Sequence, residues 1–197
     1  MSLEIFLALL LFAFVASFTP GPNNLMLLAS GVNFGFRRTI PHMLGIGLGF
    51  LFLMLCVGFG LGALLTAAPV LHTALKVAGA AYLCYLAWRI ATSRGFGDAK
   101  GAGRPMSFLE AAGFQWVNPK AWMMSLTAMA AYTSTESPVL SVLIVGLVFI
   151  LVTMPVVSVW TGFGVVLREW LNDPMRLRMF NITMAVLLVA SLWPMLR

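Results

Sequence analysis

Residues 18–24 read Phe-Thr-Pro-Gly-Pro-Asn-Asn and lie near the middle of a run, residues 5–36, that contains no charged side chain. As one helix this run would be roughly 48 Å long, at about 1.5 Å per residue, whereas the hydrocarbon core of a membrane is about 30 Å thick. Pro20 and Pro22 each lack an N–H and bias the preceding residue away from helical conformation. The stretch therefore predicts a membrane-spanning helix that is broken at its centre, with Pro22 in the first turn of the second half.

A second interruption lies at residues 115–122, Gln-Trp-Val-Asn-Pro-Lys-Ala-Trp. Asn118 followed by Pro119 is typical of a helix start, with the asparagine as N-cap and the proline at the first helical position. If both breaks lie at mid-membrane, two helix N-termini with unpaired N–H groups and partial positive charge approach each other. They would suit a carboxylate, and the carbonyls freed in the preceding half-helices would suit an ammonium group. An amino acid carries both groups.

Lys120 is a further candidate for this site, because it is the only charged residue between residues 111 and 135. A lysine inside a span costs about 2.5–3.5 kcal/mol on insertion scales, so it is a functional candidate. It could pair with a substrate carboxylate or release its proton during transport. The alternative is that the span starts at Asn118 and Lys120 lies at the cytoplasmic interface. The predicted site consists of Pro20, Gly21, Pro22, Asn23, Asn24, Gln115, Asn118, Pro119 and Lys120.

Composition places the rest of the chain in a membrane as well. The 197 residues are 61% hydrophobic and 9% charged, with a mean hydropathy of +0.98. Soluble domains are about 45–50% apolar and about 25% charged, so a soluble domain, and with it a nucleic-acid-binding domain, is excluded. We expect an all-α integral membrane protein with six transmembrane helices, of which the first and fourth are broken. The expected spans are about 4–30, 40–64, 71–92, 108–134, 139–166 and 178–196.

Basic side chains are distributed unevenly between the loops. Nine of them follow the first, third and fifth spans, whereas only Lys76 and Arg197 fall on the opposite side. By the positive-inside rule the nine are cytoplasmic and both termini are outside. Three spans per half then predict two inverted three-helix repeats, residues 1–92 and 108–197, joined by a cytoplasmic linker at 93–107. The nine are Arg37, Arg38, Arg89, Arg94, Lys100, Arg104, Arg168, Arg176 and Arg178.

Several further residues invite interpretation. His42 is a candidate proton relay, although an interfacial, hydrogen-bonded histidine is the preferred interpretation. Pro155 predicts a kink in the fifth span that could line the pathway. Small residues on one face of the second span predict close helix packing within the monomer, in preference to a homodimer seam. This face consists of Gly45, Gly49, Cys56 and Gly60. Four tryptophans lie near predicted span ends, namely Trp88, Trp160, Trp170 and Trp193.

Enzyme and metal chemistry find no support in the residue pattern. All six acidic residues fall at termini or in loops, neither histidine has an acid beside it, and Cys56 and Cys84 are far apart. General acid–base or nucleophilic catalysis needs such groups together. Metal transport would need clustered thiolates, imidazoles or carboxylates. We therefore predict no enzyme activity, no metal site and no cofactor.

Four short stretches, in this order along the chain, resemble the LysE-type family of bacterial amino-acid exporters, which includes the homoserine/threonine exporters. They are Thr-Pro-Gly-Pro-Asn (19–23), Gly-Phe-Arg-Arg (35–38), Leu-Lys-Val-Ala-Gly-Ala-Ala-Tyr-Leu (75–83) and Phe-Gln-Trp-Val-Asn-Pro-Lys-Ala (114–121). The resemblance covers essentially the whole chain. Pro-Gly-Pro-Asn-Asn (20–24) and Ala-Trp-Arg-Ile-Ala-Thr-Ser (87–93) look closest to the cysteine/O-acetylserine exporter branch.

The resemblance implies secondary-active export of small amino acids or their derivatives across the bacterial cytoplasmic membrane, by antiport with protons. Because no acidic residue is predicted at mid-membrane, Lys120, His42 or the substrate itself would have to carry the proton. The expected partners are a small amino acid, protons and the lipid bilayer, and a homodimer remains open. The alternative is a membrane assembly or interaction protein that does not transport.

Overall fold

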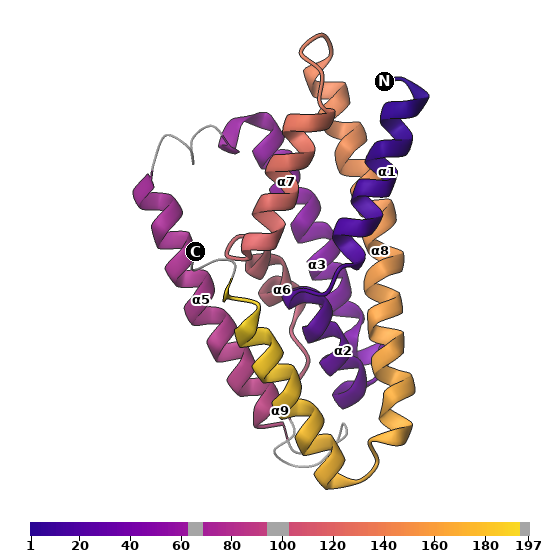
Figure 1. Cartoon of the computed structure of the whole chain (residues 1–197), viewed down its shortest axis with the longest axis vertical. Coiled ribbons are helices and arrows are strands. Elements are labelled where there is room, and N and C mark those ends of the chain that lie inside the picture. The colour runs from indigo at the N-terminus through magenta and orange to yellow at the C-terminus, as the bar shows by residue number, and fades with distance from the viewer. Residues whose placement is uncertain (63–68, 94–102, 194–197) are drawn as a thin grey trace.

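The computed structural model describes residues 1–62, 69–93 and 103–193, and all regular structure in these residues is helical (Figure 1). The all-α prediction is therefore confirmed for this part of the chain. The elements are α1 (Leu3–Phe18), α2 (Pro22–Phe34), α3 (Phe36–Cys56), the π-helical turn η1 (Val57–Leu61), α5 (Pro69–Ala91), α6 (Phe108–Gln115), α7 (Pro119–Tyr132), α8 (Pro138–Trp170) and α9 (Pro174–Ala190).

Prolines mark the helix starts. Helices α2, α7, α8 and α9 each have proline in the first turn, where its missing N–H is not needed. Asn118 caps α7, since its side-chain oxygen accepts a hydrogen bond of 3.1 Å from the Lys120 backbone N–H. The predicted helix start at Asn118–Pro119 is confirmed. The predicted break around Pro20 is confirmed too, because α1 and α2 meet there at an angle of 55°.

Length and apolar composition identify fewer membrane spans than the sequence predicts. Within the described residues, α8 and the segment Phe36–Leu61, which joins α3 to η1, are each long and apolar enough to cross a membrane. The bent pair α1–α2 makes a third if it counts as one span. Helices α6, α7 and α9 are 8, 14 and 17 residues long, so none reaches the ~20 residues of a complete span by itself. The count of six and the repeat arrangement stay predictions.

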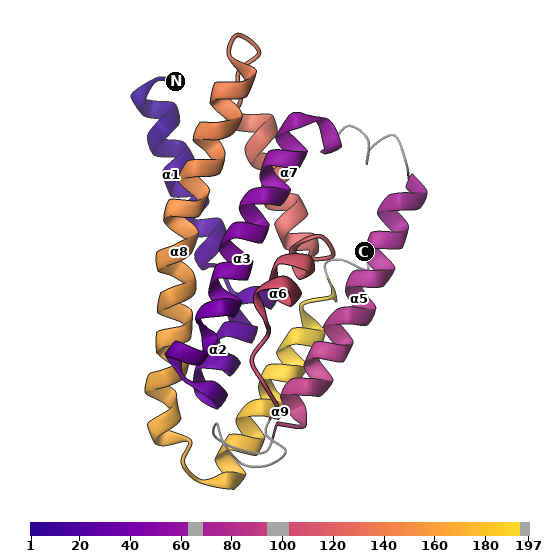
Figure 2. The same cartoon turned by 180° about the vertical axis from the view of Figure 1, so that it is seen from behind.

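The helices alternate in direction along the chain. In Figure 1, α1 and α2 descend, α3 rises, α5 descends, α6 and α7 rise, α8 descends and α9 rises. The connections α2–α3 and α8–α9 and the end of α5 consequently gather at the lower end of the molecule (Figures 1 and 2). These are the segments that carry the basic side chains of the described loops. Arg94, Lys100, Arg197 and most of the predicted linker 93–107 lie outside the described residues.

Glycines allow the closest helix contacts. Helix α2 packs on α8, and a Cβ added at Gly31 would collide with the backbone carbonyl of Thr161. Helix α3 packs on α6, where a Cβ at Gly49 would lie 2.5 Å from the Ala112 Cα, and one at Gly45 would collide with a backbone carbonyl of α6. The prediction that this small-residue face packs within the monomer is confirmed for Gly45 and Gly49.

Helix α8 covers the whole of the fifth expected span, 139–166. It ends at Trp170, a few residues beyond the expected span 139–166, and Arg168 lies in its last turn. It also runs without a break through Pro155, whose side chain is exposed. Its neighbours Thr153 and Val156 are buried, and the kink and the place of Pro155 beside a pathway stay predictions.

Candidate functional site

The break between α1 and α2 exposes backbone carbonyls, since the last C=O groups of a helix have no partner within it. The Asn24 side-chain amide donates to the carbonyl oxygens of Ser17, at 2.8 Å, and Thr19, at 3.0 Å. The indole N–H of Trp160 on α8 donates to the Phe18 carbonyl at 3.3 Å. The end of α1 is therefore held open by side chains from α2 and α8 instead of being closed by further helix.

The ammonium group of Lys120 reaches this same break from the start of α7. Its Nζ donates to the carbonyl oxygen of Thr19 at 2.6 Å, and the side chain is half-buried. Gly21 makes room for it, because a Cβ at position 21 would lie 2.8 Å from Lys120 Cδ and 3.1 Å from Nζ. The backbone φ of Gly21, −171°, is open to any residue, so the requirement there is for space. No carboxylate in the described part of the chain pairs with Lys120.

An amide pair joins the two broken helices directly. Asn23 Nδ2 donates to Gln115 Oε1 at 2.8 Å, and Gln115 Nε2 donates back to Asn23 Oδ1 at 3.1 Å. Gln115 is fully buried, and its Nε2 also donates to the carbonyl of Ala111 at 2.9 Å. The pair fixes the start of α2 against the end of α6, over a separation of 92 residues.

The N-termini of α2 and α7 both lie at mid-height in the molecule and point their helices towards opposite ends (Figures 1 and 2). Each N-terminus carries roughly half a positive charge on its first N–H groups. With the Lys120 ammonium between them, this region is positive, while the carbonyls at the end of α1 supply the opposite polarity next to it. The arrangement has complementary places for an anionic and a cationic group.

A small cavity of about 40 Å³ lies at this place. At about 10–15 Å³ for each water molecule, it has room for roughly three. Six of the predicted site residues line the cavity: Gly21, Asn23, Asn24, Gln115, Asn118 and Lys120. Pro20, Pro22 and Pro119 shape the two breaks but are not among its lining residues.

The structure brings residues to the cavity that the sequence reasoning did not identify. Ser17 and Thr153 line it, with their hydroxyl oxygens 3.4 Å apart, and Phe50, Val156 and Val157 supply apolar walls. Thr153 lies two residues before Pro155, which was the only sequence signal near it. Trp160, named above as a tryptophan near a span end, lies against the break, where its N–H has a carbonyl partner.

His42 does not line this cavity. Its surroundings contradict the preferred interpretation of an interfacial, hydrogen-bonded histidine. The side chain is 1% exposed, and neither ring nitrogen has a hydrogen-bond partner in the described residues. A histidine at an interface would have found such a partner in water or in a headgroup. The turn after Pro41 instead continues α3 into the protein, and this buries His42.

Metal ligation finds no support in the described residues, where no group of three or more His, Cys, Asp and Glu side chains lies close enough together to hold a metal ion. Cys56 and Cys84 are free. The chemistry of the site therefore rests on amides, hydroxyls, backbone carbonyls and one ammonium group.

Apolar helices of membrane-spanning length, with a polar centre built on two helix breaks, define an α-helical membrane protein with an internal polar site. The chain belongs to the LysE type translocator family, whose family model matches residues 14–190. It is 36% identical over 131 residues to the cysteine/O-acetylserine efflux protein of Escherichia coli strain K12 and 34% identical to that of Salmonella typhi. Each match covers 66% of this chain and 66% of the relative. No solved structure matches the chain.

Proposed function

We propose that this chain exports small amino acids or their derivatives from the cytoplasm, with O-acetylserine and cysteine as the first candidates. Membership of the LysE type translocator family and the printed names of the relatives support this proposal. The chain would be a multi-pass protein of the bacterial inner membrane with both termini outside. Residues 1–92 and 108–197 would form its two inverted halves, with residues 93–107 as the cytoplasmic linker.

The observation that carries the proposal is the position of Lys120. Its ammonium group lies between two helix N-termini, and its hydrogen bond goes to the Thr19 carbonyl. A substrate carboxylate is a stronger partner for an ammonium group than a neutral carbonyl, because both partners are then charged. When the carboxylate takes Lys120, the Thr19 carbonyl becomes available to the ammonium group of the same substrate. The site would thus exchange an internal contact for two contacts to an amino acid.

Transport would follow from changes in the packing around this site. The Asn23–Gln115 pair connects the two broken helices, so movement of one half against the other would open the cavity to one side at a time. The proton carrier of an antiport cycle would be Lys120, His42 or the substrate. The first of these is the best placed, because release of its proton would remove the charge that holds the carboxylate.

The test is uptake of labelled amino acids into inside-out membrane vesicles with an imposed pH gradient. We expect gradient-dependent uptake of O-acetylserine or cysteine in the wild type and its loss in Lys120→Ala at equal protein levels. Arg178→Gln, which changes an exposed charge that is not among the cavity-lining residues, serves as the matched control and should transport normally. No uptake of any amino acid by folded wild-type protein would overturn the proposal. Such a result would favour a membrane assembly protein.

A further inference from the structure

A second cavity, of about 70 Å³, lies nearer to the arginine-rich end of the molecule. Helices α2, α3 and α5 and the segment 103–106 form its walls. At about 10–15 Å³ for each water molecule it has room for roughly five, which makes it the larger of the two cavities described here. Nothing in the mechanism proposed above uses it.

His42 lines this cavity as a buried polar group without a partner. A neutral imidazole has one N–H donor and one acceptor nitrogen, and buried polar groups are nearly always hydrogen-bonded. No described residue satisfies either nitrogen of His42. The cavity beside it is the place from which a partner can come.

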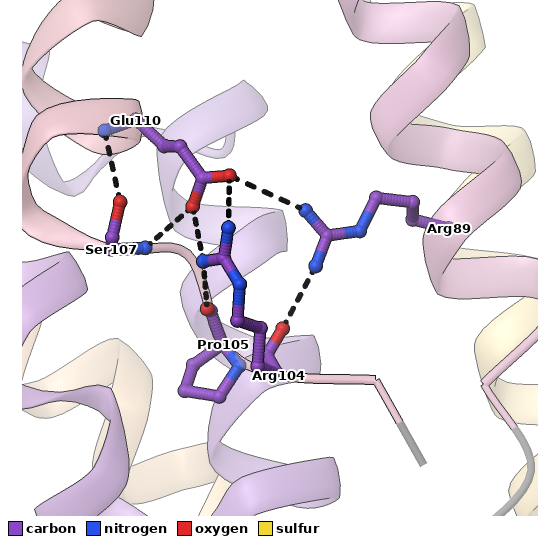
Figure 3. Close-up of polar contacts among 5 residues, drawn as sticks. All are labelled: Arg89, Arg104, Pro105, Ser107 and Glu110. Carbon is purple, nitrogen blue, oxygen red and sulfur yellow. Dashed lines mark hydrogen bonds and ion pairs between the residues drawn. The ribbon is translucent and has the colours of Figure 1, made fainter. Parts of the chain in front are cut away.

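Two arginines that line the same cavity, Arg89 and Arg104, contact a single carboxylate, that of Glu110 (Figure 3). The carboxylate of Glu110 is held by Arg104, with hydrogen bonds of 2.6 and 2.7 Å from the two terminal nitrogens. Arg89 lies 3.9 Å from the same carboxylate and donates to the Arg104 carbonyl at 3.0 Å. Two guanidinium groups thus share one carboxylate among the described residues. Both arginines line the cavity, so a second carboxylate would balance this cluster.

The remaining walls limit the size and character of an occupant. Apolar side chains, Met26, Leu86 and Met106 among them, line one part of the cavity. Ser30 and Asn33 line another, but both already have partners, since Ser30 bonds to Thr39 at 2.8 Å and Asn33 to Asn181 at 2.8 Å. The groups that need a ligand are therefore His42 and the arginine cluster.

The two cavities follow each other along the same helices. Ile46 of α3 lines the central cavity and His42 lines the second one, which is one helical turn or about 6 Å further along the axis. On α2, Asn24 lines the central cavity and Met26 the second one. A molecule in the second cavity would therefore lie next to the central site, on the side of the basic loops.

We propose that the second cavity is a cytoplasmic entry subsite for the exported amino acid, in which Arg89 binds the carboxylate and His42 a polar group of the short side chain. This inference rests on the proposed function. It assigns two successive positions to the substrate, the first at Arg89 and His42 and the second at Lys120.

The experiment uses the full chain in lipid nanodiscs with ¹⁵N-labelled histidine. The chain has two histidines, so the variant His72→Gln leaves a single imidazole to observe. O-acetyl-L-serine is the probe, and its decarboxylated analogue, O-acetylethanolamine, is the control. We expect the signals of His42 to shift saturably with O-acetyl-L-serine and to stay in place with the analogue. The Lys120→Ala variant should retain the shift, and Arg89→Gln should weaken the apparent affinity at least tenfold, whereas Arg178→Gln should not.

Each contrary result has a separate meaning. Signals of His42 that do not move, or that move equally with the decarboxylated analogue, overturn the subsite while vesicle uptake still supports export. A shift that disappears in Lys120→Ala also overturns it, because His42 would then only report binding in the central cavity. Absence of uptake in the vesicle experiment overturns export, and the subsite with it. The comparison of the two ligands needs neither the Arg89 nor the Lys120 variant, so a variant that fails to fold leaves the test intact.

Discussion

Replacement of Gly21 by alanine tests the central site without removing any of its polar groups. The added Cβ would lie 2.8 Å from Lys120 Cδ, whereas carbon atoms in contact are about 3.5–4.0 Å apart. The lysine side chain must therefore move by about 0.7–1.2 Å. An equal movement of Nζ would lengthen its 2.6 Å hydrogen bond to the Thr19 carbonyl to about 3.3–3.8 Å, which is beyond the usual limit of about 3.2 Å.

The expected effect follows from the strength of that contact. Hydrogen bonds to charged groups contribute about 1.5–3 kcal/mol, and about 1.4 kcal/mol corresponds to a factor of ten. Since the misplaced ammonium group would meet the substrate carboxylate equally poorly, we expect transport efficiency to fall about 10- to 100-fold in Gly21→Ala.

The assay is the initial rate of O-acetylserine uptake into inside-out vesicles, measured over a range of concentrations at matched protein levels. Gly113→Ala is the control, because a Cβ at Gly113 of α6 meets no atom within 4 Å. Alanine is also a poorer N-cap than glycine, which would lower stability by up to about 1 kcal/mol, so the thermal unfolding of both variants is recorded as well. Normal transport by folded Gly21→Ala would refute the reasoning that the position of Lys120 decides activity.

Three further predictions concern contacts between helices. Asn23→Ala and Gln115→Ala should each reduce uptake. Expressed as free energies, the loss in the double variant should be smaller than the sum of the two single losses by about 0.6–1.7 kcal/mol. Losses that simply add would contradict a functional amide pair. Asn181→Ala should lower the free energy of unfolding by about 1–2 kcal/mol, because Asn33 loses its buried partner, and an unchanged melting temperature would argue against this contact. Gly31→Ala should destabilise the protein by about 1–3 kcal/mol through the collision with α8, and a more stable variant in thermal unfolding would show that α2 and α8 do not approach so closely.

Local chemistry explains which parts of the fold were predictable. The break around Pro20 and the helix start at Pro119 follow from the missing proline N–H and from asparagine capping, which act within a few residues. The expected span 139–166 describes a membrane segment, and α8 continues past it through Arg168 to Trp170. A helix can end at a different residue from the one at which the chain leaves the membrane.

Contacts between distant segments explain the rest. The sequence placed Asn23 and Gln115 in one site but did not show that their side chains pair. Nothing in it joins Ser17 to Thr153 or Trp160 to the Phe18 carbonyl, since these pairs come together only when helices pack. The burial of His42 has the same origin. A residue next to a predicted span boundary can lie in water or in the core, and the neighbouring helices α2 and α5 decide which.

The most direct test of the account is to observe the Lys120 side chain while the substrate binds. The chain has three lysines, Lys76, Lys100 and Lys120, so protein labelled with ¹³C at lysine Cε gives three signals, and Lys120→Arg identifies the one of interest. We expect O-acetyl-L-serine to shift the Lys120 signal saturably, because its carboxylate replaces the Thr19 carbonyl, and O-acetylethanolamine to leave it in place. A Lys120 signal that stays in place while the protein binds and exports O-acetyl-L-serine would contradict a role of Lys120 in binding the carboxylate.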